Sequence, residues 1–305
     1  MTPSVPGPPR QLRRALLCIL FLSSKTSTHD SIVSCALSPF VGVVGVVGGA
    51  VHHSPPPFRD HHSRNNNVDR RCIRTAPYHP SIHTLGNTGF GGFVHACAAW
   101  PFTAAIDHVA YSQLNMRRAI ARRVIARSTK YQCRDAHAHV ERRNLRVLDV
   151  GCGAGTLTYE LAFTNELDVV GVDTSREMIR VAQTIVRHPN VRFEVCNGID
   201  VCRAYDIGIV CMVMHELPPD ANAHLLRHLR HVCSEVWIAD IVPTYVPSKS
   251  MLAGEPYLLE YLLTIEDIVR QERVLSREDV VPGHVRLWKV GSYDHKRKKG
   301  LGATS

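Results

Sequence analysis

The sequence predicts an α/β fold built on a mostly parallel sheet with helices on both of its faces. Two observations after residue 144 support this class. Short apolar stretches alternate with helical segments of about ten residues, and the apolar stretches are nearly continuous, as in strands buried on both faces. A third observation concerns the end of the chain, where two strand-like stretches flank Pro282, Gly283 and His284. This turn predicts that the sheet finishes with an antiparallel hairpin.

The expected elements follow one another in a regular order from residue 145. Apolar periodicity and length separate the short strands from the helices. Strands are expected at 145–150, 168–172, 191–195, 206–214, 235–240, 273–281 and 285–290. Helices are expected at 156–163, 177–186, 221–232 and 256–269.

The first 88 residues differ in composition from the rest. The chain has 305 residues and a net charge of +9, and its first Glu is Glu141. Pro, Ser, Gly, Asn and His dominate residues 1–88, and a short apolar stretch, 15–22, follows Arg13 and Arg14. We interpret this part as a poorly ordered leader, with a signal or transit peptide as the alternative to simple disorder. The expected location is cytoplasmic or organellar. The sequence contains no run of 18 apolar residues, so we expect no stable membrane span.

A single domain is expected from residue 89 to residue 293. It divides into a helical roof (89–140), a core (144–240) and an acceptor-side helix with the terminal hairpin (241–293); a basic tail, 294–305, follows. Apolar spacing predicts one or two helices over 89–127, with a break near Pro101. The basic cluster from Arg117 to Arg127 suits either a nucleic-acid patch or, as we expect, the solvated face of an amphipathic helix.

A glycine-rich loop follows the first strand, in V-L-D-V-G-C-G-A-G-T at 147–156. Alternate glycines permit a tight strand-to-helix turn and allow a ligand to lie against bare backbone. The second strand, V-V-G-V-D at 169–173, ends in Asp173, which can accept hydrogen bonds from the hydroxyls of a ribose. Asn197 and Gly198 follow the third strand and can lie beside an adenine ring. A dehydrogenase loop, G-x-G-x-x-G, would carry its third glycine at Thr156.

Together these motifs resemble the class I S-adenosylmethionine-dependent methyltransferases over residues 145–240. The resemblance implies a Rossmann-like seven-stranded sheet whose last strand is antiparallel, and S-adenosyl-L-methionine as cofactor. H-E-L-P-P at 215–219 and G-E-P-Y-L-L-E-Y at 254–261 are similar to the small-molecule branch related to ubiquinone and menaquinone C-methyltransferases. The cofactor-binding residues implied by the resemblance are Asp149, Gly151, Cys152, Gly153, Gly155, Asp173, Thr174, Asn197, Gly198 and Met214.

Catalytic and acceptor-binding residues are expected around this cofactor site. His215 and Glu216 follow the fourth strand and can serve as a general base for an acceptor that must lose a proton. The alternative is that Glu216 caps the next helix and His215 packs against it. Tyr111, Tyr257 and Tyr261 are expected to line the acceptor pocket, with ordinary packing as the alternative.

The remaining expectations concern partners and metals. The ten cysteines form no C-x-x-C pair, and we expect free thiols, several of them buried, and no structural metal site. The acceptor is expected to be a small molecule, because residues 111–305 are nearly neutral and indicate no phosphate-binding face. Two rivals stay open: a binding module without catalysis, and an RNA or protein methyltransferase. The sequence does not determine the oligomeric state.

Overall fold

The computed structural model describes residues 88–137 and 143–293. Within these ranges one seven-stranded sheet has the order β3-β2-β1-β4-β5-β7-β6. The first five strands pair in parallel, whereas β7 pairs antiparallel with both β5 and β6, as the terminal hairpin predicted. The strands are β1 (Leu145–Val150), β2 (Leu167–Asp173), β3 (Val191–Val195), β4 (Tyr205–Cys211), β5 (Cys233–Ile241), β6 (Val274–Val281) and β7 (Val285–Gly291).

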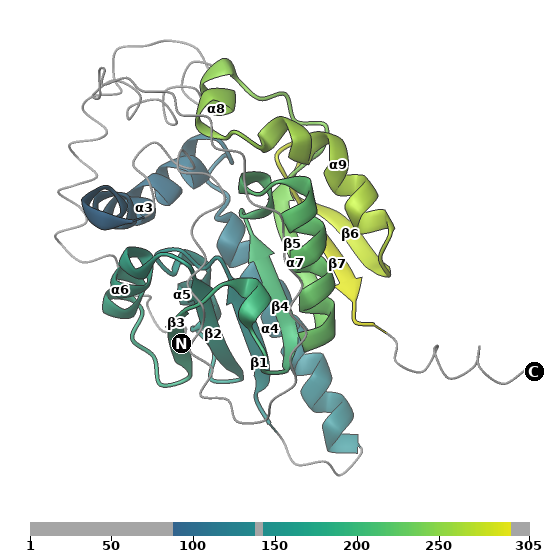
Figure 1. The fold of residues 1–305 in the computed structure, drawn as a ribbon. Helices are drawn as coiled ribbons and strands as arrows, with labels where there is room; N and C mark the ends of the chain where they lie inside the picture. Colours follow the sequence, from purple (N-terminus) through teal and green to yellow (C-terminus); the bar gives the residue numbers. More distant parts are fainter. Residues whose placement is uncertain (1–87, 138–142, 294–305) are drawn as a thin grey trace, which may run out of the picture.

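Helices surround the sheet and cover both of its faces (Figure 1). Neighbouring residues of a strand point to opposite faces, so Leu148 and Val147 of β1 belong to two different hydrophobic clusters. One cluster packs the sheet against α7 and α9, and the other packs it against α4 and α5. The helices are α3 (Gly89–Val109), α4 (Met116–His137), α5 (Thr156–Leu161), α6 (Arg176–Ile185), α7 (Pro219–Val232), α8 (Lys249–Gly254) and α9 (Leu258–Arg270). Two 3-10 turns, η1 (Gly198–Asp200) and η2 (Met214–Glu216), follow β3 and β4.

The predicted break near Pro101 is wrong. Helix α3 continues through Pro101, and the chain breaks later, between α3 and α4, where Ser112 and Gln113 adopt positive φ values of 51° and 67°. Proline removes one backbone donor and disfavours the helical conformation of the residue before it, but tertiary contacts can compensate for this cost. Here Ala96 and Trp100 of α3 pack against Ala154 in the loop after β1. These contacts keep the helix continuous over that loop.

The arginines of α4 attach this helix to the rest of the domain. Each of three partly exposed arginines forms an ion pair with a carboxylate from another element: Arg118 with Glu160, Arg123 with Glu278, and Arg127 with Glu235. On the opposite side of α4, Met116, Ile120 and Val124 are buried against the sheet. The helix is therefore amphipathic as expected, but its basic side is largely paired within the domain and is not simply solvated.

Further predictions concern the two ends of the chain, the cysteines, metal sites and membrane spans. The predicted leader, apart from Thr88, and the tail from residue 294 lie outside the described residues. The six cysteines whose side chains the structure describes are all free thiols, and Cys152, Cys196 and Cys233 are buried. Across the same ranges, no three or more potential ligand side chains gather as a metal site would need. None of the helices described there has the length and apolar character needed to cross a membrane.

Candidate active site

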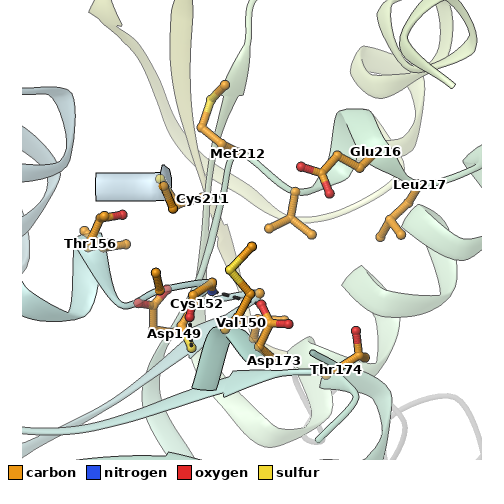
Figure 2. A pocket seen from close by; sticks show the side chains of 18 of the residues that line it. Asp149, Val150, Cys152, Thr156, Asp173, Thr174, Cys211, Met212, Glu216 and Leu217 are labelled. Atoms are coloured by element: carbon orange, nitrogen blue, oxygen red, sulfur yellow. Dashed lines mark hydrogen bonds between the residues drawn. The ribbon is translucent and has the colours of Figure 1, made fainter. Parts of the chain in front are cut away.

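A pocket opens at the carboxyl ends of β1, β2, β3 and β4 (Figure 2). The strand order reverses between β1 and β4, and ligands of open α/β sheets bind beyond the strand ends at such a switch point. Nine of the residues predicted from the sequence line the pocket: Asp149, Gly151, Cys152, Gly153, Asp173, Thr174, Asn197, Gly198 and Glu216. The structure thus brings together in one cavity residues that lie up to 67 positions apart in the sequence.

The glycine loop needs its glycines for two different reasons. Gly151 and Gly153 have φ values of +66° and +52°, which residues with a side chain rarely adopt. A Cβ atom on Gly151 would lie 2.5 Å from Cγ2 of Val213. The backbone of the glycine loop therefore lies directly against the side chain of Val213, in the turn after β4. A Cβ atom on Gly153 would meet nothing within 4 Å. The loop therefore presents bare backbone to open space, as a ligand lying against it requires.

Asp173 connects the glycine loop to the end of β2. Its Oδ2 accepts the N–H of Gly153 at 2.9 Å, and its Oδ1 accepts the N–H of Ser175 at 2.7 Å. A carboxylate offers about four acceptor sites, so an oxygen that accepts one backbone N–H can also accept from a ligand. In Figure 2, Asp173 and Thr174 lie toward one side of the pocket, and Asp149, Thr156 and Cys211 lie toward the other.

Asp149 is buried at the end of β1, directly before the loop. Its Oδ2 accepts a hydrogen bond of 2.6 Å from the hydroxyl of Thr158 in α5. Burial raises the pKa of this carboxyl group to about 7, although the Thr158 hydroxyl and the positive charge of Arg117 both lower it. Asp149 thus joins β1 to α5 and also contributes a titratable carboxyl group to the pocket wall.

Asn197 begins the 3-10 turn η1 after β3. Its side-chain oxygen accepts the N–H of Ile199 at 3.2 Å and so caps the turn. A Cβ atom on the next residue, Gly198, would lie 2.6 Å from Cγ1 of Val150. Asn197 and Gly198 line the pocket near the ends of β2 and β3, and the sequence predicts that an adenine ring lies beside these two residues.

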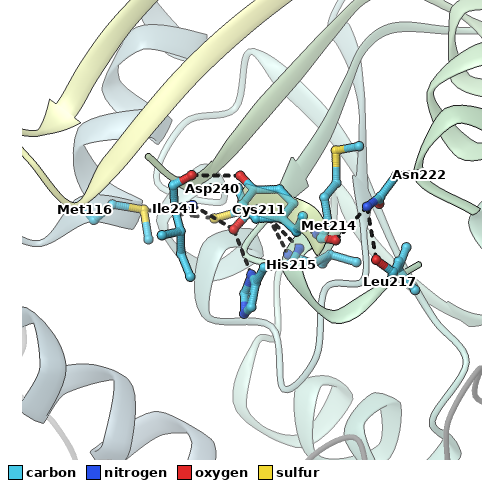
Figure 3. A network of polar contacts seen from close by, with 10 residues as sticks. Met116, Cys211, Met214, His215, Leu217, Asn222, Asp240 and Ile241 are labelled. Atoms are coloured by element: carbon cyan, nitrogen blue, oxygen red, sulfur yellow. Dashed lines mark hydrogen bonds and ion pairs between the residues drawn. The ribbon is translucent and has the colours of Figure 1, made fainter. Parts of the chain in front are cut away.

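The turn after β4 is organised by a buried carboxylate, Asp240, which the sequence analysis missed (Figure 3). Asp240 lies in β5 and has no exposed surface. Its Oδ2 accepts the N–H groups of Val213, Met214 and His215, at 3.2, 2.8 and 3.4 Å. Its Oδ1 accepts the N–H of Ile241 and lies 2.7 Å from Nδ1 of His215. The carboxylate therefore satisfies the otherwise unpaired N–H groups at the start of η2.

His215 and Glu216 are placed differently by this turn. The ring of His215 is buried, does not line the pocket, and is 6.2 Å from the ring of Tyr261. Burial lowers the pKa of His215, but the charge of Asp240 and its hydrogen bond outweigh burial and raise the pKa to about 10. Glu216, the next residue, lines the pocket. An imidazolium paired with Asp240 has no lone pair for a proton, so Glu216 is the better placed of the two predicted bases.

Six predicted site residues lie outside the pocket lining: Gly155, Met214, His215, Tyr111, Tyr257 and Tyr261. Tyr261 is fully buried in the core, and its hydroxyl donates to the carbonyl oxygen of Ile241 at 2.8 Å. Met214 is buried within η2, where its carbonyl oxygen accepts from the side chain of Asn222 at 2.8 Å. Tyr111 is half-buried and contacts the ring of His284 edge-on. Packing explains the placement of Tyr261 and Met214.

The pocket also contains side chains that the sequence analysis did not identify. His95, Ala99 and Thr103 are spaced by four residues and present one face of α3 to the pocket. The indole N–H of Trp100 donates to the carbonyl oxygen of Ala154 at 2.8 Å, which holds α3 against the glycine loop. Further lining residues are Arg117 at the start of α4, Cys211 at the end of β4, and Met212 and Leu217 around η2. Met212 has a φ of 57°, a strained conformation for this residue type.

Comparisons with known proteins concern the same part of the chain. Residues 147–235 match the family model described as a methyltransferase domain. No curated protein matches the chain at the significance required. Among solved structures, magnesium protoporphyrin IX methyltransferase from Synechocystis PCC 6803, with bound S-adenosylmethionine, is 18% identical with a TM-score of 0.40. The match covers 57% of this chain and 80% of that one.

A second solved structure is similar to a comparable extent. Phosphoethanolamine N-methyltransferase 2 from Haemonchus contortus, in complex with S-adenosyl-L-methionine, is 17% identical with a TM-score of 0.42. The match covers 50% of each chain, so this chain spans half of that protein. Identities at this level do not indicate the acceptor. The family match identifies residues 147–235 as a methyltransferase domain, and the sheet order and the pocket at the switch point suit an enzyme that depends on S-adenosylmethionine.

Proposed function

We propose that this domain transfers a methyl group from S-adenosylmethionine to a small organic acceptor, with Glu216 as the general base. One observation carries the proposal. Glu216 lines the same pocket as the glycine loop and Asp173, so the carboxylate that can remove a proton faces the cavity in which the cofactor is expected to bind. Asp240 holds the turn that carries Glu216, through hydrogen bonds with the backbone of the turn and with the ring of His215.

The residues around the pocket fit the cofactor. Asp173 can accept from the ribose hydroxyls, and the open space above Gly153 suits a ligand that lies along the loop. Asn197 and Gly198 are positioned to border the adenine, and Asp149, Cys211 and Met212 to border the methionine part. When bound, S-adenosylmethionine supplies an electrophilic methyl group on a sulfonium sulfur.

The chain's own residues supply alignment and proton transfer. Displacement at a methyl carbon requires the acceptor atom to be held in line with the leaving sulfur, and positioning of this kind contributes much of the acceleration. An acceptor such as a phenol or an acid must also lose a proton, and Glu216 can take it. His215 acts through its neighbour: its ion pair with Asp240 holds the turn, and so it positions Glu216 without touching the acceptor.

Two features support a small acceptor. The face of α3 that carries His95, Ala99 and Thr103 forms part of the pocket wall, which limits the space open to a large substrate. On α4, Arg118, Arg123 and Arg127 are paired with carboxylates of the domain, which makes their charges less available to a nucleic-acid backbone. The similarity to quinone C-methyltransferases, and the acceptor-lining roles of Tyr111 and Tyr257, remain predictions.

The experiment combines cofactor binding with a transfer screen. Titration calorimetry on the full chain is expected to show binding of S-adenosylhomocysteine and much weaker binding of NAD. A screen with tritiated S-adenosylmethionine across quinols, phenols, sterols and small acids then identifies the acceptor. On that acceptor, Glu216→Gln is expected to lower kcat by about 10²-fold while the affinity for S-adenosylhomocysteine stays within about threefold.

Glu260→Gln, an exposed change on α9, is the matched control and should leave both quantities unchanged. If NAD binds in preference to S-adenosylhomocysteine, the proposed cofactor is wrong. If the cofactor binds as expected but Glu216→Gln transfers methyl groups at the full rate over the whole pH range, the role of Glu216 as base is wrong and the cofactor assignment stands.

A further inference from the structure

Arg117 is unusual among the residues that line the pocket. It is half-buried, it is the second residue of α4, and it is the only Arg or Lys among the described lining residues. The acidic side chains of the lining are Asp149, Asp173 and Glu216. A single guanidinium therefore enters a cavity wall that is otherwise acidic or uncharged, apart from His95.

Its neighbours on α4 show what an arginine of this helix does when it serves the fold. Arg118 pairs with Glu160 through a nitrogen–oxygen distance of 3.0 Å, and Arg123 pairs with Glu278 at 3.1 Å. For Arg117, by contrast, the described part of the structure contains no ion pair and no side-chain hydrogen bond. Asp107 and Asp149 interact with the charge of Arg117 only at longer range, where that charge lowers the pKa of each carboxyl group against the larger, raising effect of burial.

The position of Arg117 across the sheet restricts what it can contact. Its charge acts on Asp149 at the end of β1 and on Cys211 at the end of β4. The groups that we assign to the nucleoside lie on the other side of β1, with Asp173 at the end of β2 and Asn197 just after β3. Arg117 therefore faces the part of the pocket where the methionine portion of the cofactor and the acceptor meet, an inference that depends on the proposed function.

We propose that Arg117 binds a carboxylate in this pocket. A guanidinium presents a planar set of donors that matches the two oxygens of a carboxylate, and this bidentate contact is stronger in a half-buried site than in water. The positive end of the helix dipole adds to the attraction, since Arg117 lies in the first turn of α4. Two ligands can bring the carboxylate: the amino-acid part of S-adenosylmethionine, or an acceptor that is itself a small acid.

The nearby acidic residues leave the guanidinium available. The N–H of Met116 hydrogen-bonds to Asp107, so that carboxyl group is already engaged with the start of α4. Asp149 accepts from Thr158 instead of Arg117. Burial raises the pKa of both carboxyl groups, that of Asp149 to about 7, which reduces the negative charge that would repel an incoming carboxylate.

The test compares ligands that differ by the carboxylate. We would measure the affinity of the full chain for S-adenosylhomocysteine and for 5′-methylthioadenosine, which keeps the nucleoside and the sulfur but lacks the amino-acid part. A second pair, benzoate and benzamide, is titrated with S-adenosylhomocysteine saturating. The variants are Arg117→Gln and Arg117→Lys, and Arg122→Gln is the matched control, because Arg122 is exposed on the same helix.

If the carboxylate belongs to the cofactor, Arg117→Gln should weaken S-adenosylhomocysteine at least tenfold, or about 1.4 kcal/mol, and leave methylthioadenosine within twofold. Arg117→Lys should lose less. If it belongs to the acceptor, S-adenosylhomocysteine should change less than threefold, and benzoate should lose at least tenfold while benzamide does not. Either result supports the proposal, provided that Arg122→Gln behaves as the unaltered chain does.

Two results would overturn the proposal for Arg117 and leave the proposed function intact. In the first, Arg117→Gln binds S-adenosylhomocysteine as the unaltered chain does, and benzoate shows no binding that depends on Arg117. In the second, S-adenosylhomocysteine and methylthioadenosine weaken together, which would indicate a structural role for the side chain. Failure of the unaltered chain to bind S-adenosylhomocysteine would remove the proposed function, and this inference with it.

Discussion

Asp173 and Asp240 are two carboxylates at the same edge of the sheet, and each holds backbone N–H groups of a loop. Asp173 accepts the N–H groups of Gly153 and Ser175, and it lines the pocket. Asp240 accepts from four backbone N–H groups and from the ring of His215, and it is completely buried. The hydrogen-bonding chemistry is the same, but only Asp173 retains access to a ligand.

The difference separates binding from positioning. Asp173 shapes the glycine loop and also faces the cavity, so its removal should affect ligand affinity most. Asp240 lies beneath the turn that carries Glu216, and its removal would leave the buried charge of His215 and several N–H groups without a partner. A loss of that kind is expected to affect the stability of the fold before it affects any ligand.

The largest expected effect is therefore that of Asp240→Ala on stability. The free energy of unfolding at pH 7 should fall by about 3–5 kcal/mol, because one partner of a buried ion pair is removed. Urea unfolding followed by circular dichroism measures the change. Asp267→Ala, which breaks an exposed pair with Arg270 on α9, should cost no more than about 1 kcal/mol. A loss below about 1 kcal/mol for Asp240→Ala would remove the distinction between the two carboxylates.

Asp173→Ala tests the other half of the comparison. The affinity for S-adenosylhomocysteine should fall by about 1.5–3 kcal/mol, since the hydrogen bonds to the ribose are charge-assisted. Calorimetry measures the affinity, and thermal unfolding of the same sample shows whether the fold is retained. Asp168→Ala, near the opposite end of the same strand, serves as the control because Asp168 bonds only to Asn144 among the side chains described. Unchanged affinity in Asp173→Ala would contradict the ribose assignment.

Per unit of pH, the smallest of the three effects is the pH dependence contributed by His215. Its pKa is raised from 6.5 to about 10 in the folded state, by Asp240 against the opposing effect of burial and with smaller contributions from Glu255 and Glu216. Between these values the folded state binds one proton more than the unfolded state. The stabilisation is therefore complete below about pH 6.5 and is lost as the pH rises toward 10, with a slope of about 1.4 kcal/mol per pH unit.

His215→Gln isolates this contribution from other groups that titrate in the same range. Unfolding by urea at several pH values from 6 to 10 should show a shallower decline for the variant than for the unaltered chain. Parallel declines would mean that His215 is not protonated in the folded state, and Asp240 would then act mainly on the backbone N–H groups.

The strands and the glycine loop were predicted well because their signals are local. Strands β1 and β3 have the predicted bounds, and the other strands differ by a few residues at their ends. The largest difference is in β4, which was expected to reach Met214 but ends at Cys211. The apolar run continues beyond that point, so hydrophobicity alone could not show that Met212 turns with a φ of 57°.

Residues that act through distant contacts left little local signal. Asp240 lies in the apolar run W-I-A-D-I, and nothing nearby in the sequence predicts that it binds the turn 25 residues earlier. Arg117 is one of several arginines in α4, and only the packing of that helix separates the pocket-facing one from those that form ion pairs. Tyr261 was expected at the acceptor, but its position on α9 turns it into the core.

The sequence by itself determined the α/β class, the terminal hairpin, the glycine loop and the acidic residue at the end of β2, Asp173. These features depend on spacing within one segment, where backbone conformation and apolar periodicity leave a direct record. Only the tertiary structure decided which side chains share the pocket, because it sets how α3 and α4 pack over the strand ends and how deeply each group is buried. Burial and neighbouring charges in turn set the ionisation of each group, which is why we propose His215 as a positioning residue and Glu216 as the base.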